Sequence, residues 1–422
     1  MDTYVVEGGA PLAGSVQVHG AKNSVLPILA ATLLGAGESV LHNCPKLSDV
    51  DASVDILRHL GCRVERTGDT VVVDSSALTR CDVPDALMRE MRSSVIFLGA
   101  ILARCGEASL TSPGGCELGP RPIDLHLSGL RALGAEIDDT GGTLHCKAAK
   151  LTGREIVLGF PSVGATENLM LAACGAEGVT VLSNAAREPE IEDLQGFLNT
   201  CGAEITGAGT STVVIRGGRP LHGGTYTILP DRIAAATYLC GAASAGGEVF
   251  LRDAREEHLS AVTAVLREAG CDVTGGSAGI VCRRTGRLTA PRPIRTAPYP
   301  GFPTDAQAIL MAALLRCRGA AVFEENLFSS RYRHVDELAR MGADIRVSGR
   351  TAVVLGVERL HGAAVRCTDL RGGAALCAAA LAAEGETAIS DITHIDRGYQ
   401  SIEDDLAALG ADIRRVEEPA SP

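Results

Sequence analysis

A short pattern of apolar and polar positions recurs six times along the 422-residue chain. Each copy has Leu, three intervening residues, Gly, a small residue, a charged residue and then Val or Ile. Such a pattern predicts a Leu on the last turn of a helix, a Gly in the left-handed conformation that closes the helix, and a β-branched residue that opens a strand. The copies are Leu57 to Val64, Leu130 to Ile137, Leu198 to Ile205, Leu266 to Val273, Leu338 to Ile345 and Leu406 to Ile413.

The spacing of the copies divides the whole chain into similar units. Consecutive glycines of the pattern are 68 to 73 residues apart. Before the pattern lies a second apolar helical stretch, a break with Gly or Glu and a short strand, as in 374–383, 384–385 and 387–389. We therefore expect helix, strand, helix, strand to recur six times. Solenoid repeats usually have roughly 20 to 50 residues, so these longer units predict globular α/β folding, three units to a domain, with helices shielded by sheets.

Composition and charge narrow the class of protein. The chain is longer than one hydrophobic core usually supports, which agrees with two domains. Hydrophobic residues make up 46% of the chain but aromatic residues only 3%, so the interior must be built from small aliphatic side chains. The net charge of -12 argues against a nucleic-acid partner, because binding phosphates needs a basic face.

The distribution of apolar residues and cysteines along the chain predicts a cytoplasmic protein. No run of about 18 apolar residues occurs and the N-terminal sequence lacks the features of a signal peptide, so neither membrane insertion nor export is expected. The 14 cysteines include no C-x-x-C pair and no zinc-finger spacing, and some of them, such as Cys240 and Cys377, lie inside apolar runs. We interpret them as reduced thiols.

Eight longer motifs, together with the six repeats, are similar to those of the enolpyruvyl transferase superfamily, and within it to the members that use UDP-N-acetylglucosamine. They are Gly20-Ala21-Lys22-Asn23, Pro113-Gly114-Gly115-Cys116, Arg121-Pro122-Ile123-Asp124-Leu125-His126, Ser162-Val163-Gly164-Ala165-Thr166, Ala186-Arg187-Glu188-Pro189-Glu190, Leu229-Pro230-Asp231-Arg232, Phe302-Pro303-Thr304-Asp305 and Ile395-Asp396-Arg397-Gly398-Tyr399.

The resemblance covers essentially the whole chain and implies the inside-out α/β barrel of this superfamily in each domain. Residues 21–229 would form one domain and residues 1–20 with 230–422 the other, with a substrate cleft between them that closes on binding. The implied reaction transfers the enolpyruvyl group of phosphoenolpyruvate to the 3-hydroxyl of UDP-N-acetylglucosamine, the first committed step of peptidoglycan synthesis. It proceeds by addition of the hydroxyl and elimination of phosphate. No metal or redox cofactor is implied, and the oligomeric state is left open.

Four residues are implied to be catalytic: Cys116, Asp305, Lys22 and Arg397. Cys116 lies in a stretch rich in Gly and Pro, which predicts an exposed loop. By resemblance it donates a proton to phosphoenolpyruvate, forms a covalent adduct with it and is alkylated by fosfomycin. Asp305 precedes an apolar helix, where Asp usually serves as the N-cap. By resemblance it is also the candidate general base for the 3-hydroxyl.

The remaining candidate residues are implied to bind substrate. By itself Lys22 would be an ordinary surface lysine before a helix, whereas a guanidinium fork suits bidentate binding of carboxylate or phosphate. The Ser162-Val163-Gly164 turn precedes an apolar helix, whose first amides can hold diphosphate oxygens. Asp231 and Asp369 are assigned to orienting arginines and lining the cleft. The phosphoenolpyruvate set is Lys22, Asn23, Arg121, Arg331, Arg371 and Arg397. The UDP-sugar set is Arg92, Arg121, Pro122, Ile123, Asp124, Leu125, Ser162, Val163, Gly164, Asp305 and Leu327.

Three sites depart from the superfamily's usual residues. Ala234 stands where an acidic residue is common, Ser329-Ser330 stand where an acidic residue and Asn are common, and Phe160 stands where some members have a basic residue. The second departure affects the sugar-contacting loop around Leu327, and the third is expected to weaken one diphosphate contact.

Three other functions compete with this interpretation. The shikimate-pathway enzyme that makes 5-enolpyruvylshikimate 3-phosphate shares the fold and the donor but lacks the Pro-Gly-Gly-Cys loop. An RNA 3'-phosphate cyclase has a more distantly similar repeat architecture, and the acidic balance of the chain counts against it. A catalytically silent paralogue would not need both the candidate acid and the candidate base.

Overall fold

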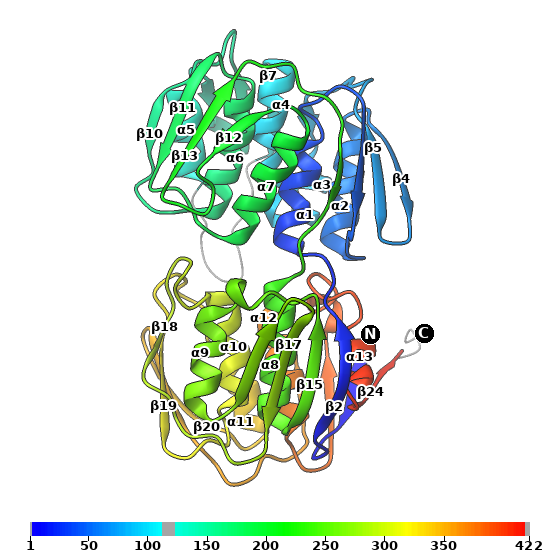
Figure 1. Cartoon of the computed structure of the whole chain (residues 1–422), viewed down its shortest axis with the longest axis vertical. Coiled ribbons are helices and arrows are strands. Elements are labelled where there is room, and N and C mark those ends of the chain that lie inside the picture. The colour runs from blue at the N-terminus through cyan, green and yellow to red at the C-terminus, as the bar shows by residue number, and fades with distance from the viewer. Residues whose placement is uncertain (1, 112–122, 418–422) are drawn as a thin grey trace. The chain divides into compact units, whose positions relative to one another are not determined.

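The computed structural model describes residues 2–111 and 123–417, and these form two compact units (Figure 1). Unit 1 contains residues 2–19 and 230–417, and unit 2 contains residues 20–111 and 123–229. Each unit has its own hydrophobic core. None of the described helices is both long enough and apolar enough to cross a membrane.

Each unit has three four-stranded sheets, and all six sheets share one topology. One edge strand, of two to six residues, runs parallel to its neighbour, and the other two strands continue the sheet antiparallel. In strand order, the sheets of unit 2 are β14 (Thr225–Thr227), β3 (Glu38–His42), β5 (Thr70–Asp74) and β4 (Arg63–Thr67); β6 (Asp82–Val83), β7 (Glu107–Thr111), β9 (Thr143–Lys147) and β8 (Glu136–Asp138); and β10 (Glu155–Val157), β11 (Gly178–Ser183), β13 (Thr212–Gly217) and β12 (Glu204–Thr206).

The sheets of unit 1 depend on both ends of the chain. Strand β1 (Thr3–Glu7) lies between two C-terminal strands, with Tyr4 opposite Ile389 on one side and Arg415 on the other. In strand order, the sheets are β22 (Ala364–Arg366), β23 (Glu386–Ser390), β1 and β24 (Asp412–Val416); β2 (Leu12–Gln17), β15 (Gly247–Arg252), β17 (Gly279–Arg284) and β16 (Asp272–Gly276); and β18 (Ile294–Arg295), β19 (Ala320–Glu324), β21 (Thr351–Leu355) and β20 (Asp344–Ser348).

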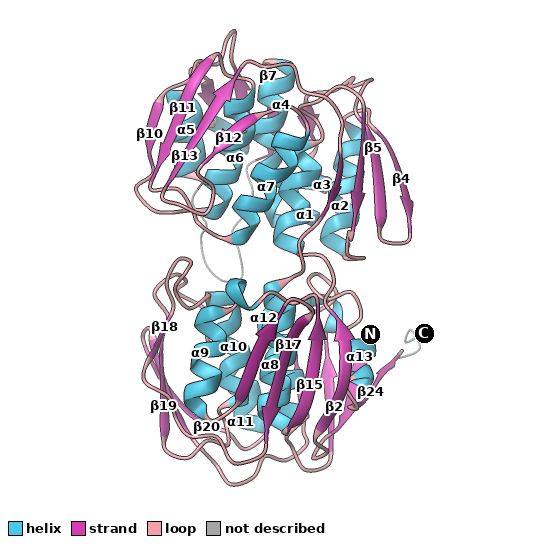
Figure 2. Cartoon of the chain, in the orientation of Figure 1, coloured by secondary structure: helices cyan, strands magenta, loops and turns pink. Residues whose placement is uncertain are grey.

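Inside each unit, three helices pack against one another, and the strands lie outside the helices (Figure 2). They are rich in Ala and other small residues and are buried on nearly every face, which allows their backbones to approach closely. In unit 1 they are α8 (Arg232–Ala245), α10 (Thr304–Ala313) and α12 (Leu370–Ala380), and in unit 2 they are α1 (Lys22–Ala31), α4 (Phe97–Cys105) and α6 (Val163–Cys174).

The other helices connect strands of the sheets. They are α2 (Ser48–His59), α3 (Asp85–Glu90), α5 (Asp124–Ala132), α7 (Pro189–Thr200), α9 (Ser260–Ala269), α11 (Val335–Arg340) and α13 (Ile402–Ala408), with short 3-10 turns at η1 (Arg92–Ile96), η2 (Thr140–Gly142), η3 (Glu256–His258) and η4 (Ile392–His394).

The structure confirms the repeat. All six glycines of the pattern have positive φ, from 88° at Gly410 to 109° at Gly270. The six leucines are all buried, and each lies on the last turn of a helix that is followed by a strand. The mixed α/β class with helices shielded by sheets is also confirmed, although within the described ranges the sheets stay separate and none closes into a barrel.

Two strands in each sheet were not predicted. The pattern predicts two strands in each of the six repeats, whereas each of the six sheets has four strands. The parallel edge strands contain as few as two residues, too few to show a periodicity. Some of them also come from a distant part of the chain, as β2 and β14 do.

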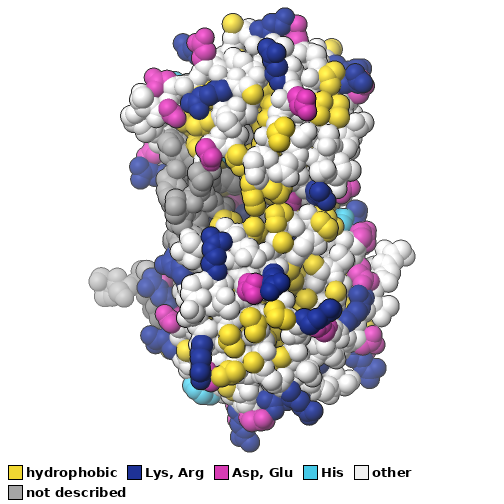
Figure 3. Space-filling view, turned by 90° about the vertical axis from the view of Figure 1, so that its left-hand side faces the viewer, with side chains coloured by type: hydrophobic (Ala, Val, Ile, Leu, Met, Phe, Trp, Pro, Cys, Tyr) yellow, Lys and Arg dark blue, Asp and Glu magenta, His cyan; other side chains and the backbone are white. Residues whose placement is uncertain are grey.

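The charges on the surface and the positions of the cysteines agree with what the composition predicts. On the face drawn in Figure 3, basic and acidic side chains are interspersed over both units. The thirteen described cysteines form no disulfide, and Cys240 and Cys377 are buried as expected.

Candidate active site

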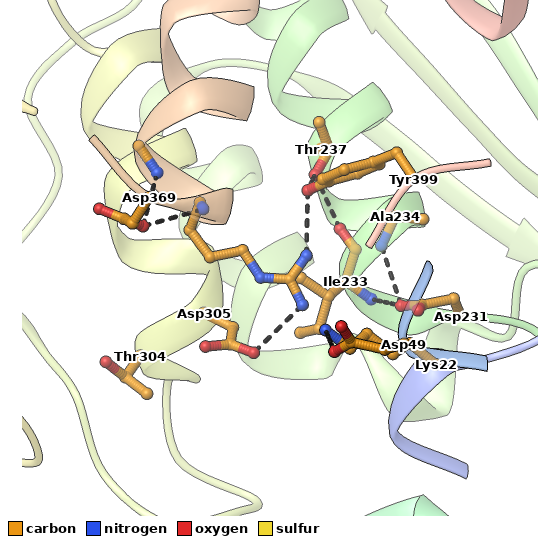
Figure 4. A network of polar contacts seen from close by, with 12 residues as sticks. Lys22, Asp49, Asp231, Ile233, Ala234, Thr237, Thr304, Asp305, Asp369 and Tyr399 are labelled. Carbon is orange, nitrogen blue, oxygen red and sulfur yellow. Dashed lines mark hydrogen bonds and ion pairs between the residues drawn. The ribbon is translucent and has the colours of Figure 1, made fainter. Parts of the chain in front are cut away.

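The central helices of unit 1 begin with a group of carboxylates (Figure 4). Asp231 is the N-cap of α8, and its Oδ1 accepts hydrogen bonds from the amides of Ile233 and Ala234 at 2.7 and 3.0 Å. Asp369 is the N-cap of α12, where its Oδ1 accepts from the amides of Arg371 and Gly372, both at 3.0 Å. Both carboxylates therefore cap helices, a role that the sequence analysis did not assign to them.

Asp305 is not a cap. Helix α10 begins at Thr304 with Pro303 in the cap position, so Asp305 is its second residue and the expectation of an N-cap was wrong. Its two oxygens bind two different guanidinium groups: Arg331 Nη2 forms an ion pair with Oδ1, and Arg371 Nη2 lies 3.2 Å from Oδ2. The carboxylate is thereby fixed in orientation.

Both of these arginines are buried, which is unusual for charged side chains. Arg371 also donates to the hydroxyl of Tyr399 at 3.1 Å, and that hydroxyl in turn lies 2.7 Å from Thr237 Oγ1. Burial alone would lower the pKa of the Arg371 guanidinium, but Asp305, Tyr399 and Asp231 raise it above its ordinary value. Arg371 therefore remains a cation inside unit 1.

A buried glutamate orders the loop beside this group. Glu325 accepts hydrogen bonds from the amides of Leu327 and Phe328 at 2.8 and 3.0 Å, and from the hydroxyl of Thr304 at 2.9 Å. It thus ties the predicted sugar-contacting loop to the start of α10. The departure at Ser329-Ser330 follows directly, with Ser329 exposed to solvent.

In unit 2, Lys22 is not an ordinary surface lysine. It is the first residue of α1, only 9% exposed, and its Nζ lies 2.6 Å from Oδ2 of the buried Asp49. The neighbouring Asn23 is half-buried. Burial beside a carboxylate keeps this ammonium in a defined place.

The predicted diphosphate turn also begins a helix. Ser162 is the N-cap of α6, and its Oγ accepts from the amide of Ala165 at 3.3 Å. Ser162, Val163 and Gly164 are half-buried. Phe160, one of the three departures noted in the sequence, is 46% exposed beside this turn.

Known proteins share this whole architecture. A family model described as EPSP synthase (3-phosphoshikimate 1-carboxyvinyltransferase) matches residues 6–406. The chain belongs to this family. UDP-N-acetylglucosamine 1-carboxyvinyltransferase 2 of Caldanaerobacter subterraneus is 51% identical over 416 residues, covering 99% of this chain and all of the relative. A protein of the same activity name from Symbiobacterium thermophilum is 50% identical over 98% of this chain and 95% of its own length.

Solved structures of family members agree in fold. The enolpyruvyl transferase NikO from Streptomyces tendae superposes with a TM-score of 0.88 at 26% identity, covering 99% of both chains. EPSP synthase from Acinetobacter baumannii superposes with a TM-score of 0.76 at 19% identity, and this likeness shows the fold alone.

The structure brings together only some of the residues that the family resemblance selects. Asp305, Arg331 and Arg371 are in direct contact in unit 1. Arg397 lies half-buried in the segment between η4 and α13. In unit 2, Ile123 precedes α5, Asp124 is exposed and Leu125 is half-buried. Cys116, Arg121, Pro122 and the side chain of Arg92 lie outside the described part of the chain.

Several residues that build these sites were not selected from the sequence. Glu325 and Asn168 are buried polar residues, but Glu325 lies between Glu324 and Asn326, and Asn168 follows Thr166 and Glu167, so the sequence around them carries no signal of their burial. Tyr399 and His126 stand in the quoted motifs, but no role was assigned to either. Among the described residues, no group of three or more His, Cys, Asp or Glu side chains is arranged to hold a metal ion.

Proposed function

We propose that this member of the EPSP synthase family transfers the enolpyruvyl group of phosphoenolpyruvate to the 3-hydroxyl of UDP-N-acetylglucosamine, with release of phosphate. The proposal is supported by relatives 47% to 51% identical over nearly the whole chain, which are named for this activity. The observation that carries it chemically is the carboxylate of Asp305, held on each oxygen by a buried arginine.

Asp305 acts as the general base for the sugar hydroxyl. A base must lie within hydrogen-bond reach of the proton that it removes, about 2.6 to 3.2 Å, and a fixed carboxylate can meet that requirement without reorganising. Arg331 and Arg371 bind the anionic groups of phosphoenolpyruvate, together with Arg397. When the substrate takes over guanidinium hydrogen bonds, the Asp305 oxygens become freer to accept the hydroxyl proton.

The residues of the other unit complete the assignment. Lys22 and Asn23 bind phosphoenolpyruvate, and Arg121 binds both substrates. The turn from Ser162 to Gly164 holds the diphosphate with its backbone amides, because the N-terminus of a helix attracts anions. Arg92 and residues 121–125 of unit 2 bind the remainder of the UDP-sugar, together with Asp305 and Leu327 of unit 1.

Cys116 supplies the proton to the methylene carbon of phosphoenolpyruvate, forms the covalent adduct and reacts with fosfomycin. The sugar 3-oxygen bonds to the central carbon of phosphoenolpyruvate as the methylene carbon is protonated to a methyl group. The bond from that central carbon to phosphate then breaks as the methyl group loses a proton. We place the reaction in the cytoplasm, at the first committed step of peptidoglycan synthesis, with residues 21–229 and residues 1–20 plus 230–422 as the two functional domains.

Phosphate release tests the proposal. Purified protein with phosphoenolpyruvate should release phosphate when UDP-N-acetylglucosamine is added, and should not when shikimate 3-phosphate is added. The reverse pattern would reassign the protein to the shikimate-pathway reaction. If no phosphate is released with either acceptor, although the protein still binds UDP-N-acetylglucosamine, the protein is a silent paralogue.

Alkylation rates test the assignment of Cys116. Of the described cysteines, Cys105 alone is exposed and Cys81 half-buried. Desolvation raises the pKa of both thiols, including Cys105, whose sulfur is partly desolvated although the residue as a whole is exposed, and so lowers the reactive thiolate fraction. Peptide mapping after brief fosfomycin treatment should therefore find the label on Cys116 before Cys105, and Cys116→Asp should abolish labelling. Activity lost with Cys116 unlabelled would remove this residue from the acid role.

A further inference from the structure

Unit 2 contains a buried histidine beside the start of α6. His126 is the third residue of α5 and is 8% exposed. Its Nδ1 lies 3.0 Å from Nδ2 of Asn168, a residue of α6 with no exposed surface. Its Nε2 makes no hydrogen bond to any described residue.

The hydrogen bonds of Asn168 determine which of its side-chain atoms is the nitrogen. One side-chain atom lies 2.6 Å from the amide of Gly99, which can only donate, so this atom must be the carbonyl oxygen. The other atom lies 3.0 Å from the carbonyl oxygen of Val95, which can only accept, so it must be the nitrogen. Both constraints give the same orientation of the amide.

This orientation determines the tautomer of His126. Because Asn168 Nδ2 donates, His126 Nδ1 must accept and cannot carry a proton, so a neutral ring carries its proton on Nε2. Burial lowers the pKa of His126 to about 4, against the opposing effect of Asp124, so the ring is neutral near pH 7. His126 is therefore a neutral donor with its N–H on Nε2.

That N–H points toward the first turn of α6. A Cβ atom placed on Gly164 would lie 3.5 Å from Nε2 and 3.2 Å from Cε1 of His126. The amide of Ala165 binds Ser162 Oγ, but the amides of Val163 and Gly164 make no hydrogen bond within the described ranges. Two backbone donors and one imidazole donor thus lie at the same helix end.

We propose that His126 is a further binding residue, which donates a hydrogen bond from Nε2 to an oxygen of the sugar-nucleotide diphosphate held at the start of α6. Asn168 is the positioning residue that fixes the tautomer. This inference rests on the proposed function for the identity of the ligand, whereas the donor site itself requires only a bound diphosphate. The absence of a side chain at residue 164 leaves room for the imidazole ring.

Nitrogen-15 spectra of the native protein test the tautomer directly. His126 should show a protonated Nε2 and an unprotonated Nδ1 from pH 6 to 8. Addition of UDP-N-acetylglucosamine or inorganic pyrophosphate should shift the Nε2 resonance and leave Nδ1 nearly unchanged. A protonated Nδ1, or ligand binding without a shift of Nε2, would overturn the proposal.

Binding measurements with variants test the role of the donor. Hydrogen bonds to charged groups are typically worth about 10-fold to 150-fold in affinity. His126→Phe should weaken binding of UDP-N-acetylglucosamine and of pyrophosphate by that factor, whereas His126→Gln, which keeps an N–H donor, should lose less. The matched control is His145→Phe, at an exposed histidine of the same unit. Equal affinity of native protein and His126→Phe would exclude the donor role, even if the phenylalanine variant lost stability.

Two further variants separate positioning from ligand identity. Asn168→Asp keeps an acceptor for the Gly99 amide but presents a second acceptor to the ring, so Nδ1 of His126 should become protonated. An unprotonated Nδ1 in this variant would show that Asn168 does not set the tautomer.

Gly164→Ala should displace the imidazole ring of His126 and weaken pyrophosphate binding, with little change in melting temperature. If pyrophosphate binds as predicted and UDP-N-acetylglucosamine does not, the proposed function fails while the donor site stands.

Discussion

The central helices of the two units differ in the charge of the side chains at their N-termini. In unit 1, Asp231 and Asp369 cap two of the helices and Asp305 lies in the first turn of the third, with buried arginines between them. In unit 2, α1 has no side-chain cap and begins with Lys22, while α6 has the neutral cap Ser162. Its buried neighbours His126 and Asn168 are also neutral.

The difference shows how the same helix ends can serve different ligands. The N-terminus of a helix carries a partial positive charge. In unit 1, carboxylates already neutralise that charge, so an anionic ligand must bind through arginines and compete with Asp305 for them. In unit 2, open amides and a neutral donor leave the helix end available to an anion. We therefore expect the helix starts of unit 1 to be sensitive to loss of charge, and the start of α6 in unit 2 to loss of single donors. The start of α1, with its buried pair of Lys22 and Asp49, should again be sensitive to loss of charge.

The largest expected effect is on turnover in unit 1. Asp305→Asn keeps the shape of the side chain but removes the base, so kcat should fall by about 10² to 10⁴ fold. Two buried guanidiniums would also lose their counter-ion, so the free energy of unfolding should fall by about 1 to 3 kcal/mol. Phosphate release and urea denaturation measure the two quantities.

The matched control for this variant is Asp369→Asn. Asn caps a helix about as well as Asp, so this variant should keep nearly normal stability. Nearly full turnover in Asp305→Asn would assign Asp305 to binding alone. Equal losses of turnover in both variants would remove the distinction between the base and the caps.

The next effect concerns the buried ion pair of unit 2. Lys22→Met leaves the buried carboxylate of Asp49 without its lysine partner, so the free energy of unfolding should fall by about 3 kcal/mol. Lys150→Met removes an exposed pair with Glu177 in the same unit and should leave the urea unfolding curve nearly unchanged. Similar unfolding curves for the two variants would mean that burial of Lys22 does not determine its contribution.

The smallest effect is the pH dependence of stability from His126. Its folded pKa of about 4 lies below the ordinary value near 6.5, so between these values the unfolded chain binds more protons. Stability from this group is therefore present above pH 6.5 and is lost as the pH falls toward 4. His126→Gln should flatten that part of the native stability curve, whereas His145→Gln, at an exposed position, should not. If the free energy of unfolding of His126→Gln depended on pH as steeply as that of the native protein in this range, His126 would not be a buried neutral imidazole.

Several elements of the site could be recognised from the sequence because they are local. The motif around Ser162 placed a helix start where α6 begins. The motif around Asp305 placed a helix close to its true start, but local preference favours Asp as a cap and could not show that Pro303 takes that position. Without the family resemblance, the sequence around Lys22 favours a surface lysine, and it could not show the burial of this residue because that depends on Asp49 from another helix.

What the sequence by itself determined is the series of helix-to-strand units and the family to which they belong. The six glycines can be recognised in the sequence because a left-handed residue at a helix end is a local backbone requirement. Only the tertiary structure decided the pairing of β1 and β2 with C-terminal strands, the contact of Arg371 with Asp305 across 66 residues, and the contact of Asn168 with His126 across 42 residues. These contacts form when distant segments pack together, and no local preference records which segments will meet.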